Sequence, residues 1–168
     1  MQRSGHIGGA MLFSAMLSAQ LGLLRAHALI LALAASAVAT FPDEDLKWHL
    51  HRGFTHSLLF LAFASAAFGL LGCFLWTILP SQLGCSEWSC LVSSVDQLHV
   101  FIACSLPTLV GGGSHLFFDL MTKSGIPVLW PSGRKYAMGL FRSSNTLANY
   151  GLLALGALFL TSILMGLP

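Results

Sequence analysis

Charged residues are scarce in this sequence, because only 8% of its 168 residues are Asp, Glu, Lys or Arg. Soluble domains carry about 25% of such residues, so the scarcity excludes an ordinary soluble protein. Internal repeats, low-complexity tracts and heptads are also lacking, which excludes a solenoid or a coiled coil. The 55% of hydrophobic residues instead indicates one integral membrane domain over residues 1–168, surrounded by a lipid bilayer and without a nucleic-acid partner.

Uncharged segments of this chain approach the ~20 residues that a helix needs to cross the hydrocarbon core of a bilayer. Five such segments occur, at residues 5–24, 27–41, 58–79, 97–118 and 146–167. The first has no small-residue cleavage site followed by a soluble domain, so we do not expect a cleaved signal peptide. The sequence therefore predicts an all-α, polytopic (multi-pass) membrane helical bundle of about five transmembrane helices.

The basic residues predict the orientation of this bundle. With the N-terminus in the cytoplasm, the loops around residues 42–55 and 119–146 lie inside, and those around 25 and 80–96 lie outside. Seven of the eight basic residues are then inside, namely Arg3, Lys47, Arg52, Lys123, Arg134, Lys135 and Arg142, and only Arg25 is outside. Cytoplasmic loops carry an excess of Lys and Arg, so we expect the N-terminus inside and the C-terminus outside.

Histidine and aspartate residues, which were not used to set the orientation, gather at the same predicted inner face. They are His6, Asp43, Asp45, His49, His51, His56, His115 and Asp119. Ionisable residues at membrane depth are costly and tend to be functional. We therefore expect the inner ends of four spans to converge on one polar cluster.

Two short motifs supply carboxylates and imidazoles to this predicted cluster. Asp43 and Asp45 lie two apart after a proline that ends the second span, so in an extended chain they point the same way. Such a pair repels unless a cation lies between the carboxylates, although an acidic solvated turn remains the alternative. In the segment HRGFTHS, Gly53 offers a turn and Thr55 an N-cap, so that His51 folds back over His56.

The segment GGGSHLFFDL, residues 111–120, places two further donors on a rigid element. His115 and Asp119 are four apart, which stacks their side chains on one helix face, where they can grip one divalent ion. The glycines before them favour close helix packing over a phosphate-binding role. His6 alone is a weak candidate for a metal ligand. It is included because it lies at the same predicted inner face of the membrane as the other donors.

The candidate metal ligands are His6, Asp43, Asp45, His51, His56, His115 and Asp119. Mixed imidazole and carboxylate donors without thiolate suit a divalent metal, zinc first, with manganese or iron as alternatives. Seven donors exceed one tetrahedral site, so both a single metal with supporting residues and a two-metal site remain open.

These motifs resemble the YdjM-like family of inner-membrane, metal-dependent hydrolases. The resemblance rests on an early His, a PDxD turn, HRGxTHS and SHxxxD, and it covers His6 to about Pro131. It implies a hydrolase with a His/Asp metal centre, similar to zinc-dependent phospholipase C proteins, and the seven candidate ligands fall on the family pattern. The spacer between Asp45 and His51 is shorter than in many relatives. His49 has no family counterpart, and we expect it to support or gate the site.

We therefore expect a metal-dependent hydrolase acting on a lipid or a lipid-linked phosphate or ester at the cytoplasmic membrane surface. Asp45 is the candidate base, and Arg52 is the candidate binder of a phosphate because its guanidinium binds oxyanions bidentately. The rivals are a transporter or ion-handling protein and a noncatalytic membrane protein with a structural metal. The sequence leaves the substrate and the oligomeric state open.

Two other features remain ambiguous in the sequence. Residues 123–136 form a turn-rich interfacial loop that either caps the site or anchors the helices. Cys85 and Cys90, in the predicted outer loop, either form a disulfide or remain reduced. Cys73 and Cys104 fall inside spans, where we expect buried thiols.

Overall fold

The computed structural model describes residues 1–43, 53–83 and 95–166 and confirms the all-α class. The described part of the chain contains five long helices and a short 3-10 helix before the third of them, besides a 3-10 turn at residues 41–43. They are α1 (Arg3–Leu21), α2 (Arg25–Ala39), η2 (Phe54–His56), α3 (Leu58–Leu83), α5 (Gln97–Leu120) and α6 (Thr146–Met165). Each long helix falls on one of the five uncharged segments, and the boundaries differ from the predicted ones by a few residues.

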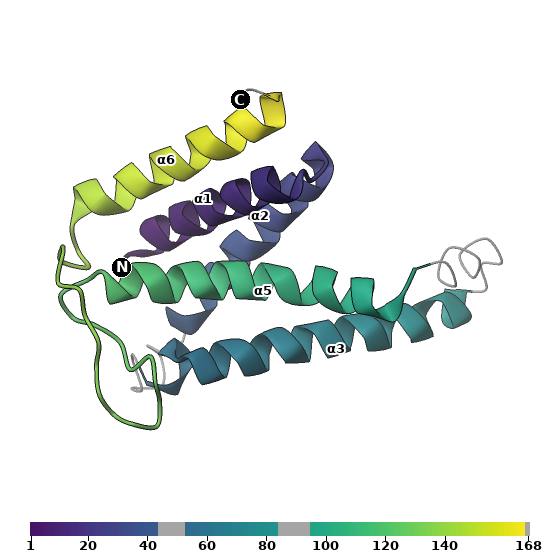
Figure 1. Cartoon of the computed structure of the whole chain (residues 1–168), viewed down its shortest axis with the longest axis horizontal. Coiled ribbons are helices and arrows are strands. Elements are labelled where there is room, and N and C mark those ends of the chain that lie inside the picture. Colours follow the sequence, from purple (N-terminus) through teal and green to yellow (C-terminus); the bar gives the residue numbers. More distant parts are fainter. Residues whose placement is uncertain (44–52, 84–94, 167–168) are drawn as a thin grey trace.

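Four helical segments of the described chain are long and apolar enough to cross a membrane: Arg25–Asp43, Leu58–Ile78, Gln97–Leu120 and Thr146–Met165. Of the five predicted spans, the first, which corresponds to α1, is not one of these four segments. Its buried face consists of small and polar residues that include Gly8, Ser14 and Ser18, and such residues suit contact with protein more than with lipid. At 19 residues α1 is about 28 Å long, and it runs beside α6 (Figure 1).

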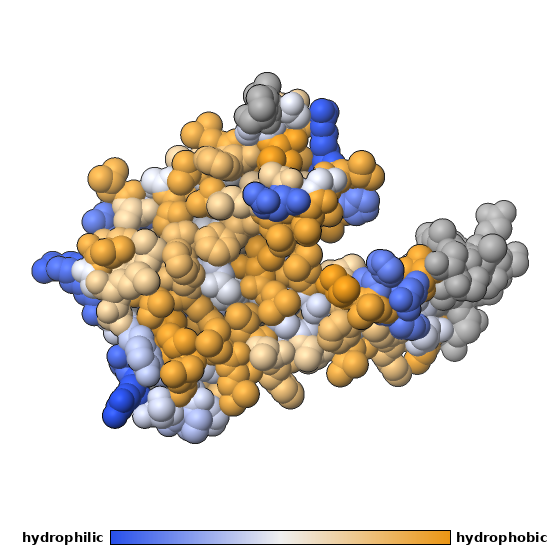
Figure 2. Space-filling model, in the orientation of Figure 1, coloured by the Kyte–Doolittle hydropathy of each residue, from blue (hydrophilic) through white to orange (hydrophobic). Residues whose placement is uncertain are grey.

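The surface of the bundle is suited to a lipid environment. Figure 2 shows hydrophobic residues over most of the visible face, with hydrophilic side chains mainly toward the helix ends. Large apolar side chains on α3 and α6, such as Phe63, Leu70, Phe74 and Leu158, are exposed. An exposed apolar surface of this extent marks contact with a membrane or a partner, and its position on the four apolar helices indicates the bilayer.

The two ends of the bundle differ in their basic residues. The starts of α1, α3 and α6 and the ends of α2 and α5 lie together at one end (Figure 1). Arg3 begins α1 at this end, and the segment after α5 carries Lys123, Arg134, Lys135 and Arg142. Arg25 begins α2 at the opposite end. The structure thus brings together five of the seven basic residues that the sequence assigned to one side of the membrane. Lys47 and Arg52 lie outside the described residues, and the identity of that side remains a prediction.

Labelling of single cysteines tests this orientation. We expect Arg134→Cys, in a variant whose four native cysteines are replaced by serine, to react with a membrane-impermeant maleimide only after permeabilisation. Leu24→Cys, in the exposed turn between α1 and α2, should react in intact cells. The reverse pattern would place the basic end outside and overturn the predicted topology.

Glycines set the closest helix contacts. A Cβ at Gly8 of α1 would collide with the backbone of Leu153 on α6, and one at Gly156 would collide with the carbonyl of Gly8. A Cβ at Gly111 of α5 would collide with the carbonyl of Ala35 on α2. These contacts confirm the packing role predicted for the glycines before His115, because only a residue without a side chain permits this approach.

The start of α3 differs from the prediction. Thr55 does not cap this helix; it lies inside η2, and α3 begins at Leu58. Ser57 caps α3 instead, since its Oγ accepts a hydrogen bond of 3.1 Å from the amide of Phe60 and donates one of 2.6 Å to the carbonyl of Phe54. Thr55 is thereby left to contact His56.

The segment between α5 and α6 packs onto the start of α3. Ile126 is fully buried, and the amide of Leu58 donates a 3.0 Å hydrogen bond to the carbonyl of Val128. The rings of Phe54 and Trp130 meet edge to face, with centroids 4.9 Å apart. The segment is therefore anchored to η2 and to the start of α3. Its role as a cap of the site remains a prediction.

The cysteines that the structure describes, Cys73 and Cys104, are free thiols as expected, but they are half-buried and not fully buried. Cys85 and Cys90 lie outside the described residues, so their disulfide remains a prediction.

Candidate metal centre

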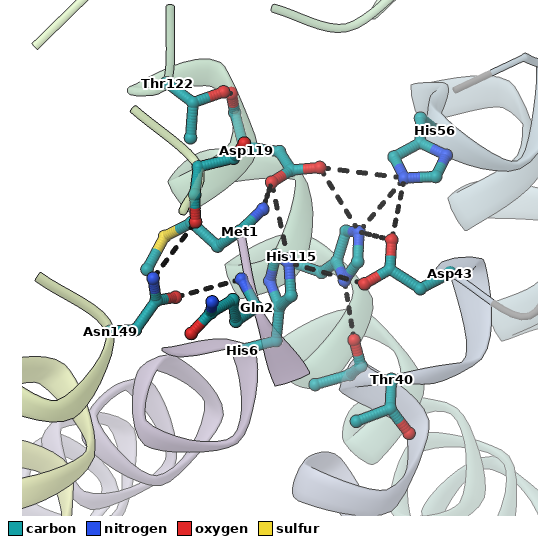
Figure 3. Close-up of polar contacts among 12 residues, drawn as sticks. Met1, Gln2, His6, Thr40, Asp43, His56, His115, Asp119, Thr122 and Asn149 are labelled. Atoms are coloured by element: carbon teal, nitrogen blue, oxygen red, sulfur yellow. Dashed lines mark hydrogen bonds and ion pairs between the residues drawn. The ribbon is translucent and has the colours of Figure 1, made fainter. Parts of the chain in front are cut away.

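Five of the seven predicted ligands converge at the end of the bundle where the basic residues lie (Figure 3). They are His6 of α1, Asp43 after α2, His56 of η2, and His115 and Asp119 of α5. Asp45 and His51 lie outside the described residues, as do His49 and Arg52, so their assignments remain predictions. The predicted convergence of four spans is thus observed for the described ligands.

Local structure explains why each side chain reaches the centre. Residues 41–43 form a 3-10 turn after α2, which directs Asp43 back toward the bundle. His56 occupies the last residue of η2 just before α3. His115 and Asp119 are one turn apart on α5, so they share one face, and the face is buried. The close approach at Gly111 brings α2, and with it Asp43, to this face.

The donor atoms face one another across a small space. His6 Nε2 lies 3.7 Å from Asp43 Oδ2 and 3.5 Å from Asp119 Oδ1. His115 Nε2 lies 3.7 Å from Asp43 Oδ1 and 3.6 Å from Asp119 Oδ2. One ligand atom from each of these four residues lies within 4.8 Å of every other. The four donors therefore surround a common point.

His56 completes the group. Its Nε2 lies 3.5 Å from Asp43 Oδ1, 3.6 Å from Asp119 Oδ2 and 3.2 Å from His115 Nε2. Two donors that bind one zinc ion at the usual ~2.0–2.2 Å in a tetrahedral arrangement lie about 3.3–3.6 Å apart. The separations of these pairs, 3.2–3.7 Å, are close to that spacing. The group of His6, Asp43, His115 and Asp119 is therefore a candidate site for a metal ion, with His56 beside it.

The electrostatics of the cluster favour a cation. Asp43 and Asp119 are both buried, and His6, His56 and His115 are fully buried beside them. Two neighbouring carboxylates repel unless a cation lies between them, and a buried charge is costly unless it is paired. Asp119 Oδ1 also forms an ion pair with the amino group of Met1. A divalent ion at the common point would contact both carboxylates at once.

The outer ring nitrogens orient the imidazoles. His115 Nδ1–H donates a 2.6 Å hydrogen bond to the carbonyl of Ala39, which leaves Nε2 with a lone pair directed at the centre. Thr55 Oγ1 lies 3.1 Å from His56 Nδ1, within hydrogen-bond distance of the outer nitrogen of that ring. His6 stacks on His115 with centroids 3.7 Å apart, and neither of its buried nitrogens has a hydrogen-bond partner among the described residues.

The supporting groups were not predicted from the sequence. Ala39 contributes a backbone carbonyl, and such a group has no side-chain signature. Thr55 was predicted to cap a helix, and its position directly before His56 is the only sequence signal for its contact with the ring.

A family model, the YdjM inner membrane protein model, matches residues 1–167 of the chain. The chain belongs to the YdjM inner membrane protein family. With its four apolar helices, this membership makes it a multi-pass inner-membrane protein. No curated protein and no solved structure gives a match.

Thr55 provides a test of the supporting contacts. We expect Thr55→Val to weaken zinc binding by about 10–100-fold, because residues that hold a ligating imidazole from outside have effects of this size. Titration with a competing chelator measures the change. Thr77→Val is the matched control, since the Thr77 hydroxyl is exposed and bonds only to carbonyls of its own helix. Equal affinities of the two variants would show that Thr55 does not orient His56.

Proposed function

We propose that this YdjM-family chain is a membrane-bound, metal-dependent hydrolase that acts on a lipid or a lipid-linked phosphate or ester at the cytoplasmic membrane surface. The observation that carries the proposal is the convergence of three imidazoles and two carboxylates at one end of an apolar helical bundle. Imidazole and carboxylate ligands without thiolate are the donor set of catalytic zinc sites in hydrolases.

The position of the cluster supports a lipid-related substrate. It lies where α2 and α5 end and where η2 leads into α3, so it is level with the ends of the candidate membrane spans. Polar headgroups of a bilayer occupy that level. Lys123 and Arg142 follow α5 and precede α6 at the same end, and basic residues so placed attract anionic lipid headgroups.

The imidazole and carboxylate groups of the cluster would bind the metal ion, and neighbouring residues orient them. A divalent ion bound there would supply Lewis acidity and would lower the pKa of water from about 15.7 toward ~7. The Ala39 carbonyl keeps His115 Nε2 free to bind, and Thr55 supports His56. Five donors exceed the three protein ligands of a typical catalytic zinc site, so two of the five are not required as ligands.

Two assignments complete the proposed mechanism and lie outside the described residues. Asp45 acts as general base, and Arg52 holds the phosphate of the substrate through its bidentate guanidinium. Both residues lie between Asp43 and His56 in the chain, and the flanking ligands fix the ends of that segment at the cluster. A two-metal site would require donors from the same segment, with Asp45 and His51 as the candidates.

An assay on a panel of phospholipids and lipid-linked phosphates tests the proposed activity. We expect zinc-dependent turnover by the wild type and a loss of at least about 100-fold in His56→Ala, since a ligand contributes more than the groups that support it. His99→Ala is the control, because His99 is exposed at the far end of α5. Bound metal without turnover across the panel would favour a structural metal, and metal flux into proteoliposomes would favour a transporter.

A further inference from the structure

An apolar pocket of about 220 Å³ lies between α2, α3 and α5, directly beside the metal centre. Phe41 and Pro42 line it next to Asp43, Thr55 lines it next to His56, and Leu116 lines it next to His115. The pocket therefore shares three stretches of chain with the cluster, although it contains none of the five ligands themselves.

The shape of the pocket follows the helices away from the centre. On α5 the lining runs from Leu116 to Thr108, and on α3 it runs from Phe60 to Phe68. Each stretch spans nine residues of helix, with a rise of about 12 Å from its first to its last residue. Because the centre lies at the ends of these helices, the pocket extends from the headgroup level toward the middle of the bilayer.

The residues that line the pocket favour a hydrocarbon ligand. Among the lining residues only Thr55 and Thr108 carry a polar side-chain atom, and the others are apolar. An engineered apolar cavity of about 150 Å³ stays dry and binds a hydrocarbon ligand, and this pocket is larger. Phe41 and Phe68 line it and are exposed, so it opens at the lipid-facing surface of the bundle.

We propose that this pocket binds one acyl chain of a glycerophospholipid and thereby places the headgroup at the metal centre. The inference rests on the proposed function, to which it adds the substrate class. A glycerophospholipid has the required arrangement, since its phosphate and ester groups lie at the headgroup level and its chains extend into the bilayer. The pocket opens into the hydrocarbon layer that these chains form, so a chain enters sideways without leaving the membrane.

Photocrosslinking tests the pocket without reference to activity. The zinc-loaded protein is placed in phosphatidylethanolamine–phosphatidylglycerol vesicles that contain phosphatidylglycerol with a diazirine on one acyl chain, and labelled residues are mapped by mass spectrometry. We expect enrichment at Leu61, Ala64 and Phe68 over the opposite, lipid-exposed face of α3. Ala64→Phe should fill the pocket and lower this labelling by about tenfold or more, the effect of displacing two methylene groups.

The control is Ala66→Phe, on the exposed opposite face of α3, which should retain both the labelling and the zinc. Uniform labelling around α3 in the wild type, or labelling at Leu61 and Phe68 that Ala64→Phe leaves unchanged, would overturn the pocket assignment. Stronger labelling by a diazirine-bearing polyprenyl phosphate would overturn the acyl chain as occupant. Pocket labelling in a protein without turnover would refute the hydrolase and leave the lipid site standing.

Discussion

Asp119→Asn is expected to weaken zinc binding by at least about 100-fold, which is the upper end of the effect of supporting residues. Asp119 Oδ1 faces His6, and Oδ2 faces His56 and His115. A neutral amide keeps the shape of the side chain but removes its negative charge and replaces one oxygen by an NH₂ donor. Zinc content after purification in detergent, measured by mass spectrometry, gives the result.

Asp96→Asn is the matched control for this change. Asp96 is exposed and caps the start of α5 at the end far from the cluster. Asn caps helices about as well as Asp, so this variant should keep the full zinc content. Equal zinc in both variants would mean that Asp119 is not a ligand.

Gly8→Leu is expected to prevent the normal assembly of α1 with α6 and to destabilise the protein by more than ~3 kcal/mol, beyond the usual cost of overpacking. Any Cβ at this position collides with the backbone of Leu153, and a helix backbone cannot move aside as a flexible side chain can. His6 would be displaced with α1, so zinc should be lost as well. Thermal unfolding in detergent and zinc content measure the two effects.

The same substitution at Gly151 serves as its control. Gly151 is exposed on α6, and nothing lies within 4 Å of a Cβ placed there. Leu is a good helix former and suits a lipid-facing surface, so Gly151→Leu should leave the unfolding temperature unchanged or raise it. A wild-type unfolding temperature for Gly8→Leu would contradict the contact between α1 and α6.

The positions of the helices were predictable because charge defines the spans. Residues 97–118 were expected to cross the membrane because Asp96 and Asp119 bound this uncharged run. The observed α5 occupies Gln97–Leu120 and includes Asp119. Whether α1 faces lipid or protein was less predictable. Its uncharged sequence indicated a span, but its small and polar residues face protein, and composition alone does not separate a helix in lipid from one inside a bundle.

The cluster was predictable from chain order, and its internal contacts were not. An alternating path through the membrane brings the start of α1, the end of α2, the start of α3 and the end of α5 to one side. His6, Asp43, His56 and Asp119 were therefore expected on the same side of the bundle. The cap of α3 was assigned wrongly because Thr55 and Ser57 are both capping residues. Ser57 takes that position, while Thr55 contacts His56, and the sequence pattern does not distinguish the two residues.

X-ray absorption at the zinc edge of the purified, zinc-loaded protein tests the metal centre most directly. The account predicts nitrogen and oxygen ligands at about 2.0–2.2 Å, with multiple scattering from histidine rings and without sulfur at about 2.3 Å. His115→Ala should reduce the imidazole contribution or abolish zinc binding. A protein that binds no divalent metal, or a spectrum dominated by sulfur, would contradict the centre formed by His6, Asp43, His56, His115 and Asp119.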